Sequence, residues 1–235
     1  MERKKAHLSY FDTKASEYDS TRGFYETGYG GLRERELLML FSRGKRVLVA
    51  ACGTGRLLPF LSKRGFEVIG IDMSKSMLSI AKTKADVYDA VSLVKCDAEF
   101  LPLRGGVFDE VICSRAFKLF PNPSGALKDW SRILSKGGRI FISLETSSPL
   151  WIRVGYKLKL PMMGSRFEWR YKVEDVKTLF QETDFRMLFR GCVIYFGRSV
   201  YETAERYFRP LLGLLKLIDS HSKNGRNVMF VAVKT

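Results

Sequence analysis

The sequence has few of the residues that metal sites and disulfides need. Its 235 residues include only two histidines and four cysteines. The cysteines stand far apart, and none are paired at metal-ligand spacing: Cys52, Cys96, Cys113 and Cys192. We therefore predict no metal site and expect reduced, mostly buried thiols of the kind found in cytosolic proteins.

Long apolar runs are also missing. No stretch is long enough to span a bilayer, and the N-terminal residues 1–5 are charged and lead into no apolar signal core. These absences predict a cytoplasmic protein. The segment 201–220 is the exception that keeps a peripheral membrane contact open, because its apolar residues recur at helical spacing. Pro210 should kink or split this helix.

Acidic residues are outnumbered, with 40 Lys and Arg against 25 Asp and Glu and a net charge of +15. The last 85 residues have an excess of +8 (16 basic, 8 acidic), and the first 150 an excess of +7 (24 basic, 17 acidic). Such a balance can attract nucleic acid, anionic lipid or an acidic substrate, or it can simply solvate a charge-rich surface.

One segment combines a strand, a glycine turn and a helix start. The apolar, β-branched run 47–51 predicts a buried strand, Gly53 and Gly55 follow, and residues 57–61 open a helix. Glycines let the backbone approach a ligand, and a helix N-terminus offers free N–H groups. The third glycine of a dinucleotide fingerprint is absent, because Leu58 stands in its place. The pattern therefore predicts a nucleotide-like ligand without a cradled diphosphate.

Two acids follow later apolar runs. Asp72 ends the run 68–71, and Asp97 ends the run 91–96. Ser74, two residues after Asp72, is expected to cap the next helix. An acid at the end of the second strand of such a unit can accept hydrogen bonds from both ribose hydroxyls. A strand-end Asp that only caps a helix, or a solvated loop acid, is the structural alternative at each position.

Together with six short segments, these features resemble the class I S-adenosylmethionine-dependent methyltransferases. Within that superfamily they are most similar to the methyltransferase type 11 branch, which includes ubiquinone and menaquinone C-methyltransferases. The segments that carry the resemblance are Tyr10–Asp19, Ala51–Gly55, Gly70–Ser74, Cys96–Glu99, Phe108–Val111 and Leu134–Arg139. The resemblance implies an α/β, Rossmann-like, doubly wound and mostly parallel seven-stranded sheet, with an antiparallel last strand and helical cap insertions.

The resemblance also implies a cofactor, S-adenosylmethionine, and residues that hold it. Asp72 would accept hydrogen bonds from the ribose hydroxyls, and Met73 would lie against the adenine. Asp97 would accept a hydrogen bond from the exocyclic amine of the adenine. The full predicted set is Tyr18, Ala51, Cys52, Gly53, Thr54, Gly55, Asp72, Met73, Met77, Asp97, Ala98, Glu99, Ser114 and Arg115. Two departures stand out: the family acid at the end of the first strand is Val49 here, and its first glycine is Ala51. The missing acid removes a charge that helps to position the amino-acid end of the cofactor.

We expect one methyltransferase domain over residues 1–235. In it, 1–45 forms N-terminal helices over the cofactor site, 46–146 forms the cofactor-binding core, and 147–172 and 199–222 form cap insertions. The first insertion interleaves aromatic and basic residues, which suits an acceptor pocket, a base-stacking surface or a self-packed cap. The candidate acceptor residues are Lys118, Trp151, Tyr156 and Trp169, and no catalytic residue is assigned. Lys118 has the alternative of an ordinary surface lysine.

Three functions fit the sequence. The first is methyl transfer to a small-molecule or lipid-like acceptor. The second, favoured by the basic charge, is methylation of RNA such as tRNA. It is weakened by the lack of an Asn/Asp-Pro-Pro-aromatic motif, since Asn122-Pro123 lacks the second proline and the aromatic residue, and by the lack of a Pro-Cys pair. The third, favoured by Val49, is a non-catalytic S-adenosylmethionine-binding protein. The oligomeric state stays open.

Overall fold

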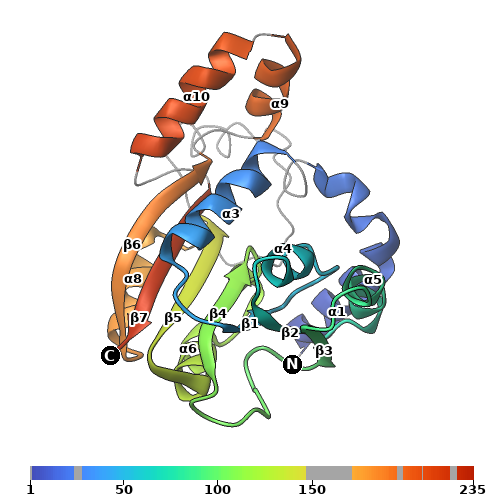
Figure 1. Cartoon of the computed structure of the whole chain (residues 1–235), viewed down its shortest axis with the longest axis vertical. Helices are drawn as coiled ribbons and strands as arrows, with labels where there is room; N and C mark the ends of the chain where they lie inside the picture. The colour runs from blue at the N-terminus through green and yellow to red at the C-terminus, as the bar shows by residue number, and fades with distance from the viewer. Residues whose placement is uncertain (1, 24–27, 147–170, 195–197, 208, 223–226) are drawn as a thin grey trace.

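The computed structural model describes residues 2–23, 28–146, 171–194, 198–207, 209–222 and 227–235. Its centre is a seven-stranded sheet in the order β3-β2-β1-β4-β5-β7-β6, with helices against both faces (Figure 1). The strands are β1 (Arg46–Ala50), β2 (Glu67–Asp72), β3 (Val91–Lys95), β4 (Phe108–Ser114), β5 (Leu134–Glu145), β6 (Phe185–Ile194) and β7 (Asn227–Lys234). The helices are α1 (Glu2–Tyr18), α3 (Tyr29–Phe41), α4 (Leu58–Ser62), α5 (Lys75–Ala85), α6 (Pro123–Ile133), α8 (Val173–Gln181), α9 (Arg198–Tyr207) and α10 (Arg209–His221), with the 3-10 turns η1 (Ser20–Arg22) and η2 (Phe117–Leu119).

The sheet has the predicted architecture. The pairs β3-β2, β2-β1, β1-β4 and β4-β5 are parallel, whereas β7 is antiparallel to both β5 and β6. The order reverses between β1 and β4, and ligands bind at such a switch point beyond the carboxyl ends of the strands. The Rossmann-like fold expected from the resemblance is confirmed.

Two apolar clusters cover the two faces of the sheet. One packs α6 and α8 against β4, β5 and β7, around the fully buried Trp130. The other packs α3 and α4 against β1, β4 and β7, and includes Leu37, Leu38 and Val49. The sheet therefore separates two apolar layers. The ends of its strands, between these layers, are available to form a site.

Some predicted boundaries were wrong. The Gly137-Gly138 pair in the sequence predicts a turn into a fifth strand that begins at Arg139, but β5 begins at Leu134 and both glycines lie inside it. Gly137 has φ +73, and the register to β4 shifts between Phe108 and Glu110, so an irregular strand replaces the turn. The sequence pattern after the glycine turn predicts a helix over 56–64, and the observed helix is shorter, at Leu58–Ser62.

The split at Pro210 is confirmed, because α9 ends at Tyr207 and α10 begins at Arg209. The two helices stand together beyond one end of the sheet (Figure 1). The buried Tyr201 of α9 donates a hydrogen bond from its hydroxyl to Asp219 of α10, at 2.7 Å from Oδ1. The Tyr201 ring also stacks on Tyr29 of α3, with 5.4 Å between ring centroids. Within the part of the chain that the structure describes, no helix has the length and apolarity that a membrane span requires.

Candidate functional site

A cleft opens at the carboxyl ends of β1, β2 and β4 and is covered by α1. It encloses about 1250 Å³ with its open mouth included. The lining residues from α1 and its end are Lys4, His7, Leu8, Phe11 and Tyr18. The strand ends and following loops contribute Val49, Ala51–Thr54, Arg56, Leu57, Asp72–Ser74, Met77, Cys96–Glu99, Ser114–Ala116 and Lys118–Phe120.

The two glycines of the turn, Gly53 and Gly55, have different surroundings. Gly53 has φ +56, and a Cβ at this position would meet no atom within 4 Å. Gly55 has φ +79, but a Cβ there would lie 3.0 Å from both Ala81 and Leu58. Gly53 therefore leaves space at the cleft, whereas Gly55 allows close packing of the turn against α4 and α5 and does not line the cleft.

Ala51 takes a strained backbone conformation. It occupies the first glycine position of the family pattern, and its φ is +50. An L-residue pays roughly 1–2 kcal/mol in this left-handed region, because Cβ approaches the following carbonyl oxygen. The turn thus holds a non-glycine residue in a left-handed backbone conformation, at the cost of strain.

Asp72 at the end of β2 organises the turn. Its Oδ2 accepts a hydrogen bond from Gly53 N at 2.8 Å, and its Oδ1 accepts one from Ser74 N at 2.9 Å. Burial raises the pKa of Asp72, and the backbone N–H groups of Ser74 and Gly53 oppose that rise. An ionised carboxylate has about four acceptor positions, more than the backbone N–H groups of Gly53, Ser74 and Met73 occupy, so a ribose hydroxyl can still donate to Asp72. The predicted Ser74 cap is also present, with Met77 N donating to Ser74 Oγ at 3.0 Å.

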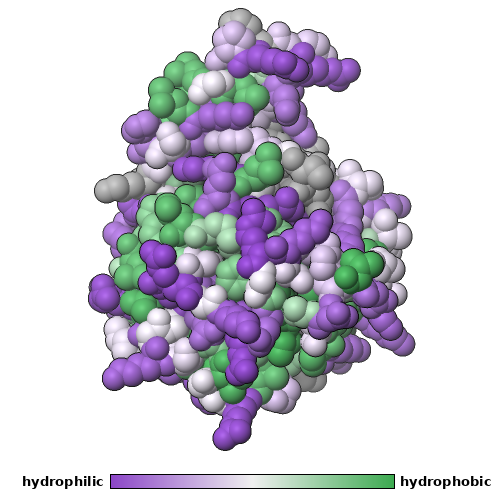
Figure 2. Space-filling view, in the orientation of Figure 1, coloured by the Kyte–Doolittle hydropathy of each residue, from purple (hydrophilic) through white to green (hydrophobic). Residues whose placement is uncertain are grey.

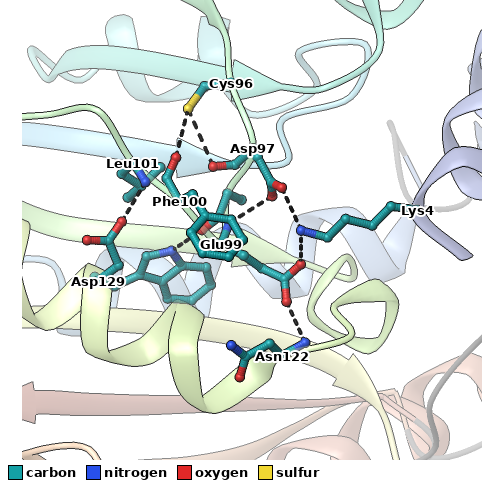
Figure 3. A network of polar contacts seen from close by, with 10 residues as sticks. Lys4, Cys96, Asp97, Glu99, Phe100, Leu101, Asn122 and Asp129 are labelled. Carbon is teal, nitrogen blue, oxygen red and sulfur yellow. Dashed lines mark hydrogen bonds and ion pairs between the residues drawn. The ribbon is translucent and has the colours of Figure 1, made fainter. Parts of the chain in front are cut away.

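The loop after β3 contains two acids bridged by a lysine from α1 (Figure 3). Lys4 Nζ lies 2.5 Å from Asp97 Oδ2 and also contacts Glu99. Burial lowers the pKa of Lys4, but hydrogen bonds to Asp97 and Glu99 outweigh it and raise the pKa overall. Glu99 in turn accepts a hydrogen bond from Asn122 N at 2.5 Å. Lys4 thus joins α1 to the predicted adenine end of the cleft.

Two further contacts join α1 to the cleft. Asp12 accepts a hydrogen bond from Ser74 Oγ at 2.6 Å, and this contact lowers the pKa of Asp12. Asp19 accepts one from Thr54 Oγ1 at 2.5 Å. The N-terminal segment is therefore joined to the loops after β1, β2 and β3.

The predicted cofactor residues come together in one place. All of them except Gly55 line the cleft: Tyr18, Ala51, Cys52, Gly53, Thr54, Asp72, Met73, Met77, Asp97, Ala98, Glu99, Ser114 and Arg115. Lys118 lines it too and is only 9% exposed, so the alternative of a surface lysine was wrong. Its Nζ lies 3.5 Å from Glu145 at the end of β5. Trp151, Tyr156 and Trp169 lie outside the described residues.

Three residues in or behind the cleft were missed by sequence reasoning. These are Lys4, Glu34 and Arg56. Glu34 is 2% exposed, and its Oε2 lies 2.5 Å from Arg56 Nη2. The only signal was the position of Glu34 three and four residues before Leu37 and Leu38, on the buried face of a helix. A charged residue at a buried helical position indicates a buried partner, but the sequence could not name Arg56 as that partner.

Comparisons with known proteins agree with this geometry. Residues 48–142 match the family model described as "Methyltransferase domain". A demethylmenaquinone methyltransferase of Thermus thermophilus is 35% identical over 154 residues, which cover 60% of this chain and 70% of that protein. The chain therefore belongs to the S-adenosylmethionine-dependent methyltransferases of class I.

The relatives place it further, in the methyltransferase type 11 branch of that class. Among solved structures, a S-adenosylmethionine-dependent methyltransferase of Thermotoga maritima, described as a possible histamine N-methyltransferase, matches with a TM-score of 0.73 and 21% identity, covering 96% of this chain and 98% of that one. Magnesium protoporphyrin IX methyltransferase of Synechocystis, solved with bound SAH, has a TM-score of 0.69 and 18% identity, covering 99% and 100%. The protein is an enzyme that uses S-adenosylmethionine, and these last two likenesses show the fold.

Proposed function

We propose that the cleft binds S-adenosylmethionine and that the enzyme methylates a small-molecule or lipid-like acceptor. The observation that carries the proposal is the composition of the cleft wall. Leu8 and Phe11 of α1 and Leu119 and Phe120 after β4 line the same space as Asp72. Polar groups that suit a ribose and an adenine thus adjoin apolar side chains that suit a ring or chain without charge. The names of two similar proteins, a demethylmenaquinone and a magnesium protoporphyrin methyltransferase, fit such an acceptor.

For methyl transfer, the main task of the protein is to align the acceptor with the cofactor. When bound, S-adenosylmethionine would supply an activated methyl group, held as a sulfonium, for in-line transfer to an acceptor nucleophile. The chain's own residues hold the reactants in line and exclude water. The helix α1, joined to the cleft through Lys4, Asp12 and Asp19, covers it from outside. The Nζ of Lys118 can donate a hydrogen bond to an oxygen of the acceptor, and Glu145 holds that amine in place.

The surface of α10 favours a lipid-like acceptor over RNA. Leu214 and Leu217 are 53% and 55% exposed, and Leu211 is also exposed. Apolar surface gathers over this helix in Figure 2. Single-stranded RNA binding instead relies on aromatic side chains and cations along a groove. The exposed leucines are better suited to apolar chains of a lipid.

A labelled-methyl assay on cell extract tests the proposal. The purified enzyme is incubated with extract and methyl-labelled S-adenosylmethionine, and the products are separated into lipid, small-molecule, RNA and protein fractions. We expect label in the lipid or small-molecule fraction. Label confined to RNA would support the RNA hypothesis, and cofactor binding without label in any fraction would support the non-catalytic one.

Replacing Lys118 provides the second test. In Lys118→Met, we expect kcat with the identified acceptor to fall about tenfold or more, since a charged hydrogen bond is worth roughly 1.5–3 kcal/mol. Cofactor affinity should change little. Lys128→Met, at a position exposed on α6, is the control for loss of a lysine. An unchanged kcat in Lys118→Met would remove this residue from the acceptor site.

A further inference from the structure

A buried acid lies directly behind the cleft, on α3. The carboxylate of Glu34 accepts hydrogen bonds from Ser114 Oγ at 2.6 Å and from Ser143 Oγ at 2.5 Å. It also lies 2.5 Å from Arg56 Nη2, and that nitrogen donates to Ser114 Oγ at 2.7 Å. The side chains of Arg56 and Glu34 are 7% and 2% exposed. Every described contact of this carboxylate thus leads to a residue at the cleft or beside it.

The carboxylate of Glu34 is ionised. Burial would raise its pKa, but the guanidinium groups of Arg56 and Arg115 and the two serine hydroxyls lower it to about 2. Glu34 therefore supplies a fixed negative charge under the cleft. Two guanidinium groups, those of Arg56 and Arg115, act on this single carboxylate.

This charge lies on the side of the sheet where the family pattern places its strand-end acid. Val49 occupies that position and packs in the same cluster as Leu37 and Leu38, one turn along α3 from Glu34. Val49 pairs with Ile112 of β4, and Ser114, two residues further on the same face of β4, donates to Glu34. The acid missing from β1 is thus matched by an acid that α3 brings to the neighbouring strand end.

The order of the strands indicates which part of the cofactor lies here. Asp97, Asp72, Gly53 and Ser114 follow β3, β2, β1 and β4, which are neighbours in that order. If the adenine lies at Asp97 and the ribose at Asp72, the amino-acid end must extend toward β1 and β4. Arg56, Ser114 and Arg115 line that end of the cleft.

We propose that Arg56 and Arg115 bind the carboxylate of the cofactor's amino-acid end, and that Glu34 is a positioning residue that replaces the family's strand-end acid. Guanidinium groups suit a carboxylate, because their planar N–H donors match its two oxygens. Glu34 and the two serines fix the Arg56 side chain before the ligand arrives, which reduces the cost of ordering it. The proposal rests on the cleft being the cofactor site.

Calorimetry with two ligands tests it. S-adenosylhomocysteine has the amino-acid end, whereas 5′-methylthioadenosine has the same nucleoside without it. We expect Arg56→Met, Arg115→Met and Glu34→Gln to weaken S-adenosylhomocysteine binding about ten- to a hundredfold, the effect of losing a charged hydrogen bond. Binding of 5′-methylthioadenosine should stay within about twofold, as expected for changes outside its site. Arg64→Met, at an exposed position just beyond α4, is the matched control and should change neither.

A rescue experiment separates positioning from general stability. Val49→Asp restores the family acid and, added to Glu34→Gln, should recover part of the lost S-adenosylhomocysteine affinity. Equal losses for both ligands, or unchanged S-adenosylhomocysteine affinity in all three variants, would overturn the proposal. If Glu34→Gln fails to fold, Arg115→Met carries the same test. Failure of the unmodified protein to bind either ligand would instead overturn the assignment of the cleft itself.

Discussion

The cofactor half of the molecule and the half with the α9–α10 pair hold their buried polar groups differently. Around the cleft, acids at or just beyond the ends of β2 and β3 and on α3 contact cations and N–H groups from α1 and from the loops after the strands, as with Asp72, Asp97 and Glu34. At the other end, β6 and β7 pack against α9 and α10 through apolar side chains. A buried hydrogen bond from Tyr201 to Asp219 joins α9 to α10. Directional contacts fix positions closely, whereas apolar packing tolerates exchange of side chains. A cofactor that many enzymes share needs directional contacts. Acceptors that differ between enzymes can be bound by apolar packing.

Acidification should affect the cofactor half most strongly. The pKa of Glu34 is about 2 when folded, against an ordinary value of 4.5. A depressed folded pKa gives stability that is present above pH 4.5 and lost as the pH falls toward 2, on the order of 3 kcal/mol in total. Asp72 acts with the opposite sign, since burial raises its pKa. Urea unfolding of the native chain and Glu34→Gln at pH 6 and pH 3 should show a steeper loss for the native chain. Parallel losses would mean that Glu34 is not the group responsible.

Removing the ribose contact should come next in size. Asp72→Ala should weaken S-adenosylhomocysteine binding by about 1.5–3 kcal/mol, the usual cost of losing a charged hydrogen-bond partner. The affinity of Asp72→Asn should lie between those of the native chain and Asp72→Ala, because asparagine keeps a hydrogen-bond acceptor but loses the charge. Calorimetry measures both. Unchanged affinity in the two variants would place the ribose elsewhere.

A change in the α9–α10 pair should separate stability from cofactor binding. Tyr201→Phe removes the hydroxyl that donates to the buried Asp219, and we expect a loss of about 1.5 kcal/mol in the free energy of unfolding. Cofactor affinity should stay within about 0.5 kcal/mol, because the residue lies outside the cleft. Tyr207→Phe, at a 72% exposed position on the same helix, is the control. A matching loss of cofactor affinity would show that the two halves are coupled.

The smallest expected effect is a gain in the free energy of unfolding. Ala51→Gly relieves the left-handed backbone at φ +50. The relief of roughly 1–2 kcal/mol is partly offset by the greater freedom of glycine in the unfolded chain, so we expect a net stabilisation of about 0.5–1 kcal/mol. Urea unfolding measures it, with Ala98→Gly, a buried alanine of the same cleft, as the control that should lose stability. A loss of stability in Ala51→Gly would show that its methyl group contributes more than the strain costs.

The proposed acceptor role of the first cap insertion stays a prediction. Replacing Trp151 or Trp169 by Ala should abolish methyl transfer while cofactor affinity changes by no more than about 0.5 kcal/mol. Both residues lie outside the described part of the chain. Full activity in both variants would move the acceptor pocket away from 147–172.

The sequence alone determined the order of strands and helices, the glycine turn and the acids at the ends of β2 and β3. It could do so because these are local patterns: β-branched runs, Gly53 at a turn, and Asp72 next to the run that it ends. Only the tertiary structure decided which distant groups meet. Glu34 and Arg56 are 22 positions apart, and Lys4 and Asp97 are 93 apart. Such pairs depend on how α1 and α3 pack on the sheet, and no local pattern encodes that packing.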